Sequence, residues 1–228
     1  MSDDQLIVLY EDNHLIAVNK QPGEIAQGDE TGDSTLIDKI KLYIKKKYNK
    51  SGEVFLGTIH RLDRPASGVI LYARTSKALT RMNQLFRDKK IEKIYWAVVG
   101  QRPSEDSAML IHYLVKNEKQ NKSYAYETEK PGTKQAILEY KIIGASERYF
   151  LLEVNLHTGR HHQIRCQLSK ISCQIKGDLK YGYARSNENG GIHLHARKIS
   201  FIHPVKNEKI EIIAEPPDER IWNLFSQG

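Results

Sequence analysis

Cysteine is nearly absent from this sequence, which holds only Cys166 and Cys173 among 228 residues. None of the paired cysteine spacings that mark zinc sites is present. We expect both thiols to lie near one face of a single helix and to stay reduced. So little cysteine is typical of a reducing compartment and excludes a small disulfide-stapled fold.

Long apolar runs are also missing. No stretch approaches the roughly 18 apolar residues of a membrane-spanning helix. The start, "MSDDQL", is acidic and does not have the pattern of a signal peptide. The sequence therefore predicts a soluble, cytoplasmic protein.

Two kinds of enzyme motif are missing as well. Neither of the glycine-rich loops that hold the phosphates of nucleotides occurs. A glycosidase needs two carboxylic acids with separated pKa values, and only one acid stands in a marked setting here. We therefore expect no cofactor.

Positive charge is abundant. Lysine and arginine number 35 against 28 acidic residues, which gives a net charge of +7, and 39% of residues are hydrophobic. The basic residues are spread through "KIKLYIKKKYNK", "RDKKIEK" and "GRHHQIR", as expected for a basic face on a folded domain. Such a face makes a polyanionic partner such as a nucleic acid plausible.

The hydrophobic patterns indicate more strands than helices. Runs typical of strands occupy 6–10, 14–20, 69–73, 91–100, 135–144, 148–157, 191–204 and 209–217. Helical spacing occurs at 34–48, 76–88 and 158–171, with Asp33 or Ser34 as the expected N-cap of the first helix. Residues 117–134 form the longest irregular stretch and read as a flexible excursion. Short turns between successive strands favour an α+β fold with a largely antiparallel sheet.

The stretch "GTIHRLDRPASGVILYARTS" places Asp63 between Arg61 and Arg64, on a turn that leads into an apolar run. A carboxylate between two guanidiniums stays ionised at neutral pH. That suits a nucleophile or a charge stabiliser, and it suits an ordinary structural ion pair equally well. The residues alone leave both readings open.

A second basic turn, "HTGRHHQIR", precedes the third predicted helix. Its Thr-Gly turn frees backbone N–H groups, and Arg160 and Arg165 would add a grip for phosphate or carboxylate. The alternative is that both arginines are surface charges. The nearby histidines, and His193 and His195 later in the chain, are compatible with a metal, but no further ligands stand out and we expect no metal site.

These stretches together resemble the RluA-type pseudouridine synthase family. "HRLDRPASG" is similar to the central motif of that family, "LHTGRHHQIRCQL" to its late motif, "EKIYWAVV" to its strand with an active-site tyrosine, "LHARKISFIHP" to its C-terminal signature and "IAVNKQPG" to its N-terminal motif. The likeness runs from about residue 6 to residue 218, in the family's order. Two departures are the Gln21 that separates lysine from proline, and Ala66 where the family usually has threonine.

The resemblance implies an isomerase that converts a specific uridine of ribosomal or transfer RNA to pseudouridine. Asp63 would be the catalytic acid, Tyr95 would lie against the flipped uracil, and Arg165 would pair with Asp63. Attack at C1′, deprotonation at C2′ and addition to C6 all need the carboxylate, and the three routes stay open. The implied fold is a long, bisected, mixed but mostly antiparallel sheet with the active site in a central cleft.

The resemblance also implies how RNA is bound. Arg61 would help to extrude the target base or would hold the RNA around it. The further candidate RNA contacts are Arg64, Arg160, His162, Lys45 and Lys46. We expect one catalytic domain over 1–228, with no separate N-terminal RNA-binding module, so selection would fall to its own basic surface, including 39–50 and 117–134. We expect a monomer. The rival readings are a non-catalytic RNA-binding protein and a hydrolase built on the histidines.

Overall fold

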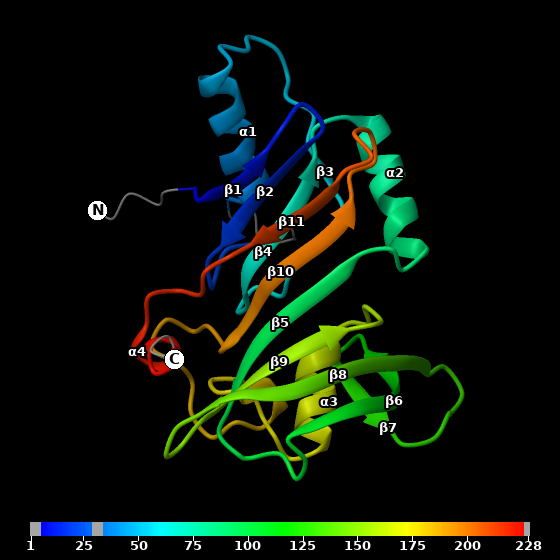
Figure 1. The fold of residues 1–228 in the computed structure, drawn as a ribbon, viewed down its shortest axis with the longest axis vertical. Coiled ribbons are helices and arrows are strands. Elements are labelled where there is room, and N and C mark those ends of the chain that lie inside the picture. Colours follow the sequence, from blue (N-terminus) through cyan, green and yellow to red (C-terminus); the bar gives the residue numbers. More distant parts are fainter. Residues whose placement is uncertain (1–5, 29–33, 226–228) are drawn as a thin grey trace. The chain divides into compact units, whose positions relative to one another are not determined.

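The computed structural model describes residues 6–28 and 34–225 (Figure 1). The chain divides into two compact units. The first unit consists of residues 1–91 and 196–215, and the second unit consists of residues 92–195 and 216–228. Each has its own strands and its own hydrophobic core.

The strands of the first unit surround a buried antiparallel pair. β2 (Leu15–Lys20) and β4 (Ser67–Ala73) are buried at every position, which explains the apolar runs "LIAV" and "VILYA" within them. β1 (Val8–Glu11) forms the predicted hairpin with β2, and the two-residue β3 (Gly57–Thr58) pairs with β4. β10 (Leu194–Ile202), which starts in the second unit, follows β4 in the strand order and pairs with β11 (Lys209–Ile213).

Two amphipathic helices complete the first unit, close to their predicted positions. α2 (Ser76–Arg87) buries Ala78 and Met82 against the core side chains of β2, β4 and β10. α1 (Leu36–Lys47) buries Leu36, Ile40 and Ile44.

The expected N-cap of α1 was wrong. Thr35 caps the helix, because its side chain accepts from the Asp38 amide while the Asp38 carboxylate accepts from the Thr35 amide. This reciprocal pair needs an acceptor three residues after the cap. Ser34 precedes the cap, and Asp33 lies outside the described residues.

The second unit is an antiparallel sheet in the order β5-β9-β8-β6-β7. β5 (Glu92–Val99), β8 (Lys134–Ala145) and β9 (Phe150–Leu156) match predicted strands. α3 (Gln163–Lys170) packs against β6 and β7, and a single 3-10 turn, η1 (Leu179–Tyr181), follows it. α4 (Arg220–Asn223) packs Trp222 on Val98 and Leu151.

Residues 117–134 are not a structureless excursion, so that prediction was wrong. β6 (Ser107–Asn117) and β7 (Lys122–Tyr126) form an antiparallel hairpin there. β7, the strand that lies wholly within this segment, reads "KSYAY" and is mostly half-buried, so it lacks the apolar run that marks a buried strand.

The two cysteines are both free and buried. The prediction that both lie on a single helix was wrong, because α3 ends at Lys170 and Cys173 lies after its end. The strand pairings and helices described above confirm the α+β class. Among the described residues, no helix is long and apolar enough to span a membrane.

Candidate active site

Asp63 lies on a tight turn between β3 and β4. The amide of Ala66 donates to the Asp63 carbonyl at 3.0 Å, which reverses the chain at Arg64 and Pro65. Leu62 and Ala66 are buried on either side, while Asp63 itself is half-buried. The turn therefore anchors its backbone in the core, with Asp63 at its half-buried start.

Gly68 fixes the way in which this turn enters β4. Its φ is +114°, and a Cβ built there would lie 2.4 Å from the carbonyl oxygen of Ala196 on β10. Only glycine fits both the backbone conformation and the close approach of the neighbouring strand. The last glycine of "RPASG" is thus required by packing.

Lys20 holds the backbone of the Asp63 turn from within the core. This role was not predicted from the sequence. The side chain is 0% exposed, and its Nζ donates to the carbonyl oxygens of Gln21 at 3.0 Å, Arg64 at 3.0 Å and Ala66 at 2.6 Å. Burial lowers the pKa of Lys20 to about 8, although Glu24 and Asp63 act in the opposite direction. The only signal in the sequence was a lysine at the end of a strand that begins with the apolar run "LIAV".

The "NKQPG" turn packs directly on the Asp63 turn. The Gly23 amide donates to the Arg64 carbonyl at 2.8 Å, and Nε of Arg64 donates to the Gly23 carbonyl at 3.2 Å. The extra residue, Gln21, is accommodated because its amide donates to the Glu24 carboxylate at 2.8 Å. The departure from the family pattern therefore leaves a well-bonded turn.

Tyr95 and Arg165 belong to the second unit. Tyr95 is half-buried on β5, opposite Val154 of β9. Arg165 is buried in α3, where Nε and Nη2 donate to the two carboxylate oxygens of Asp178 at 2.7 and 2.8 Å. Asp63 belongs to the first unit, so the pairing of Arg165 with Asp63 stays a prediction.

The second basic turn is organised by Gln163. Its side-chain oxygen accepts from the Thr158 hydroxyl at 2.7 Å and from the Arg160 amide at 3.0 Å. The Arg160 side chain is exposed, with Nε on the Gln135 carbonyl at 3.0 Å. His162 takes a left-handed conformation and stacks on His161, with ring centroids 3.8 Å apart.

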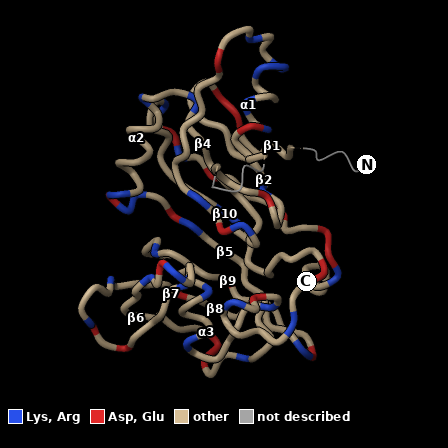
Figure 2. Tube along the Cα trace, turned by 180° about the vertical axis from the view of Figure 1, so that it is seen from behind, with Lys and Arg blue, Asp and Glu red and all other residues tan. Residues whose placement is uncertain are grey.

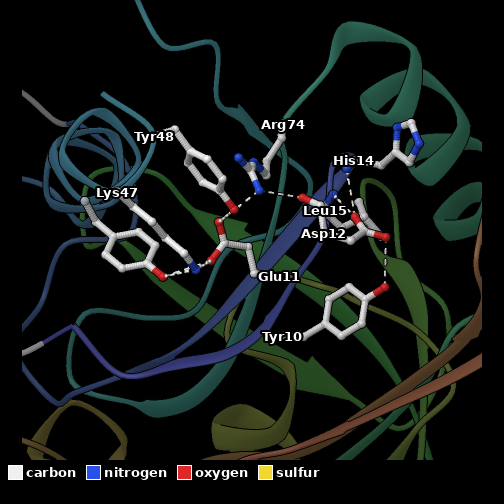
Figure 3. Close-up of polar contacts among 9 residues, drawn as sticks. Tyr10, Glu11, Asp12, His14, Leu15, Lys47, Tyr48 and Arg74 are labelled. Carbon is white, nitrogen blue, oxygen red and sulfur yellow. Dashed lines mark hydrogen bonds and ion pairs between the residues drawn. The ribbon is translucent and has the colours of Figure 1, made fainter. Parts of the chain in front are cut away.

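The lysines at the end of α1 differ in their surroundings. Lys47 donates to the Glu11 carboxylate at 2.6 Å, in a cluster that also contains Tyr48 and Arg74 (Figure 3). Nζ of Lys45 lies 3.6 Å from Oε1 of Glu53, and Lys46 is exposed. Lys47 is therefore a structural residue, whereas Lys46 faces solvent.

Arg61 and Arg64 are both exposed at the Asp63 turn. Figure 2 shows that lysine and arginine occur in both units, with acidic residues interspersed. Within the described residues, no cluster of three or more histidine, cysteine or acidic side chains is arranged to hold a metal ion.

Comparison with known proteins identifies the family. A family model described as RNA pseudouridylate synthase matches residues 14–170, a span that includes the Asp63 turn, β5 and α3. The tRNA pseudouridine synthase C of Haemophilus influenzae is 30% identical over 97% of this chain and 97% of its own length. The ribosomal large subunit pseudouridine synthase D of Zymomonas mobilis is 29% identical over 95% of this chain and 71% of its own length.

Other curated relatives are longer than this chain, which spans 61%, 66% and 68% of three of them. A solved structure titled human RNA Pseudouridylate Synthase Domain Containing 4 has the same fold. Its TM-score is 0.78 at 22% identity, with 96% of this chain and 91% of that chain covered. The resemblance in the motifs is thereby confirmed: the chain belongs to the RluA-type RNA pseudouridine synthases, which are isomerases that convert uridine to pseudouridine.

Proposed function

We propose that this protein isomerises a specific uridine in ribosomal or transfer RNA and that Asp63 carries the reaction. The observation that supports the role of Asp63 most is the rigid turn that presents it. The backbone of this turn accepts hydrogen bonds from the amides of Ala66 and Gly23 and from the ammonium of Lys20. These bonds hold the part of the chain that carries the Asp63 carboxylate. The names of the Zymomonas and Haemophilus relatives support the two RNA classes.

The reaction needs an anion and no redox partner. The N1–C1′ bond breaks and a C5–C1′ bond forms. The C5 proton is lost to solvent and N1 gains a proton, so the uracil changes its attachment without any net oxidation. An ionised Asp63 can act at C1′ as nucleophile, at C2′ as base, or by addition to C6. Each of these roles requires the carboxylate to stay charged when RNA covers it.

Tyr95 and Arg165 complete the proposed catalytic set. Arg165 would keep Asp63 ionised, and because Nε and Nη2 hold Asp178, the pair with Asp63 would use Nη1. The Asp178 pair would keep the guanidinium oriented before RNA arrives. Tyr95 would stack on the extruded uracil, and such stacking contributes about 1–3 kcal/mol per base, comparable with the cost of unstacking.

RNA would be bound by exposed basic residues of both units. Arg61 and Arg64 flank the proposed catalytic carboxylate, and Arg160 and His162 form the second basic turn, next to the β6–β7 hairpin through the contact of His161 with Asn121. Lys45 and Lys46 would add contacts at α1. We further propose that the chain acts as a monomeric, single catalytic domain in the cytoplasm, without a cofactor.

Release of tritium from C5-labelled RNA tests this proposal. The RNA would come from cells that lack this gene and would be separated into ribosomal and transfer fractions. We expect wild-type protein to release tritium from one fraction. Binding to RNA without release from either fraction would contradict the enzyme reading and favour a non-catalytic RNA-binding protein. Release abolished by a chelator would instead favour a metal-dependent activity built on the histidines.

A further inference from the structure

We propose that the solvent face of α2 and the turn after it bind the phosphate backbone of the RNA beside the target uridine. This α2 surface consists of exposed basic residues, which are Lys77, Arg81, Arg87, Lys89 and Lys90. None of them is among the RNA contacts proposed above. The inference rests on the proposed function only for its RNA substrate and does not depend on the role of Asp63.

Positive charge is concentrated on the α2 surface. Residues 76–90 contain five basic residues and one acidic residue, Asp88, which gives a net charge of +4, whereas the whole chain carries +7. This short segment therefore has a net charge more than half that of the whole chain. A dense patch of one sign attracts a polyanion and raises its local concentration.

The charge of the α2 surface is not neutralised by ion pairs. Exposed lysines elsewhere do have carboxylate partners, as Lys141 has in Glu153 at 2.9 Å. Over residues 6–28 and 34–225, no carboxylate forms an ion pair with any of the five basic residues of the α2 surface. Asp88, the acidic residue beside them, accepts from the Gln84 side-chain amide at 2.7 Å instead. An RNA phosphate would therefore meet cations that need not give up a carboxylate of the protein.

Helix stability does not account for these charges. The dipole of a helix favours cations in its last turn, where Arg87 lies, and disfavours them in its first turn, where Lys77 lies. The first turn of α2 contains no acidic residue that would offset Lys77. Lys77 therefore weakens the helix slightly, and binding of an anion from outside the protein gives it a role.

α2 is packed against the segment that leads into the Asp63 turn. The ring of Phe86, in the last turn of α2, stacks on that of His60, with centroids 5.3 Å apart and planes 29° apart. His60 directly precedes Arg61, and its Nε2 accepts from the Leu71 amide of β4 at 3.1 Å. α2 and the Asp63 turn belong to the same unit, and the 12 residues of α2 span about 18 Å. An RNA strand that reaches Asp63 can therefore continue along α2 for several phosphates.

The first test is the triple variant Lys77→Gln, Arg87→Gln and Lys90→Gln in titrations of RNA affinity at several salt concentrations. We expect the affinity to fall about 10- to 100-fold at about 0.1 M salt, and the plot of log affinity against log salt to become shallower by about two. The rate of tritium release at saturating RNA should stay within about twofold of wild type, because these residues bind the RNA backbone equally before and during the reaction.

The matched control removes the same charge from exposed residues of other elements, through Arg148→Gln, Lys209→Gln and Arg220→Gln. We expect its affinity to stay within about threefold of wild type, and urea titrations would show that both variants fold. Equal losses of affinity in the two triple variants would mean that net charge alone matters. That result, or an unchanged affinity in the α2 variant, would overturn the inference.

The second test locates the RNA by a photo-crosslinker attached to Arg87→Cys. Both native cysteines are buried, and burial raises the pKa of Cys166 to about 12, so a thiol at position 87 can be labelled selectively. We expect crosslinks to nucleotides beside the target uridine, and far fewer from Arg148→Cys. Equal crosslinking from the two positions would overturn the inference. Absence of tritium release from wild type would overturn the proposed function, whereas affinity and crosslinking would still decide whether the α2 surface binds RNA.

Discussion

Gly68 illustrates how single residues shape the backbone around Asp63. Substitution by alanine would combine a strained φ of +114° with a Cβ 2.4 Å from backbone. We expect Gly68→Ala to lower the free energy of unfolding by about 3 kcal/mol or more in urea titrations. Gly132→Ala is the matched control, because Gly132 has a φ of +79° and open space around it, so only the strain applies. Equal losses in the two variants would contradict the close packing against β10.

His193 makes the stability of the second unit depend on pH. Burial, with a smaller contribution from Lys176, lowers its pKa to about 4 from 6.5. Between these values the unfolded chain binds more protons than the folded one, so stability falls as pH drops from 6.5 towards 4. We expect this group to account for a loss on the order of 2–3 kcal/mol. His193→Gln should flatten the decline in urea titrations across this range, and an unchanged slope would contradict the assignment.

Among the secondary-structure elements, α1 carries both a structural lysine, Lys47, and a candidate RNA contact, Lys46. Glu11 of β1 accepts from Lys47 of α1 and from Arg74 after β4, which ties the helix to the strands (Figure 3). Reversing the charge of Lys45, Lys46 and Lys47 together would therefore change stability and RNA affinity at once. We expect Lys46→Glu to weaken RNA binding and to lower the salt dependence by about one phosphate contact, with no change in unfolding.

Lys47→Glu is the matched variant on the same helix. It should lower the midpoint of thermal unfolding, because it replaces the cation beside Glu11 with a second carboxylate. A loss of RNA affinity confined to Lys47→Glu, with none in Lys46→Glu, would contradict this division of roles.

Elements with strong periodicity were predictable, and those decided by distant partners were not. β2, β4, α1 and α2 have uninterrupted or helically spaced apolar residues, and the structure has them close to the predicted bounds. β7 was missed because its five residues, "KSYAY", become a strand only by pairing with β6. Cross-strand pairing of this kind is not encoded in a local period.

The candidate site likewise contains residues that could be predicted from the sequence and residues that could not. Asp63 stood out because two arginines flank it and a recognisable motif surrounds it. Lys20 did not, because a lysine at the end of a strand usually lies at the surface. Its role depends on three carbonyls, two of which lie more than 40 residues away in sequence.

On the scale of the whole molecule, a net charge of +7 spread over two units suits an enzyme that must hold a long polyanion. Electrostatic binding of this kind brings RNA to the protein without selecting a base. Selection would then depend on which uridine can leave its stack and reach Asp63, because RNA is recognised largely through exposed single-stranded loops.

The catalytic role of Asp63 is tested most directly by comparing wild type with Asp63→Asn on the RNA fraction that supports tritium release. Asparagine preserves the shape of the side chain and removes its charge. We expect Asp63→Asn to bind this RNA with an affinity close to that of wild type and to release no tritium above background. Release at a rate near that of wild type would contradict the catalytic role of Asp63 and place the chemistry on another residue.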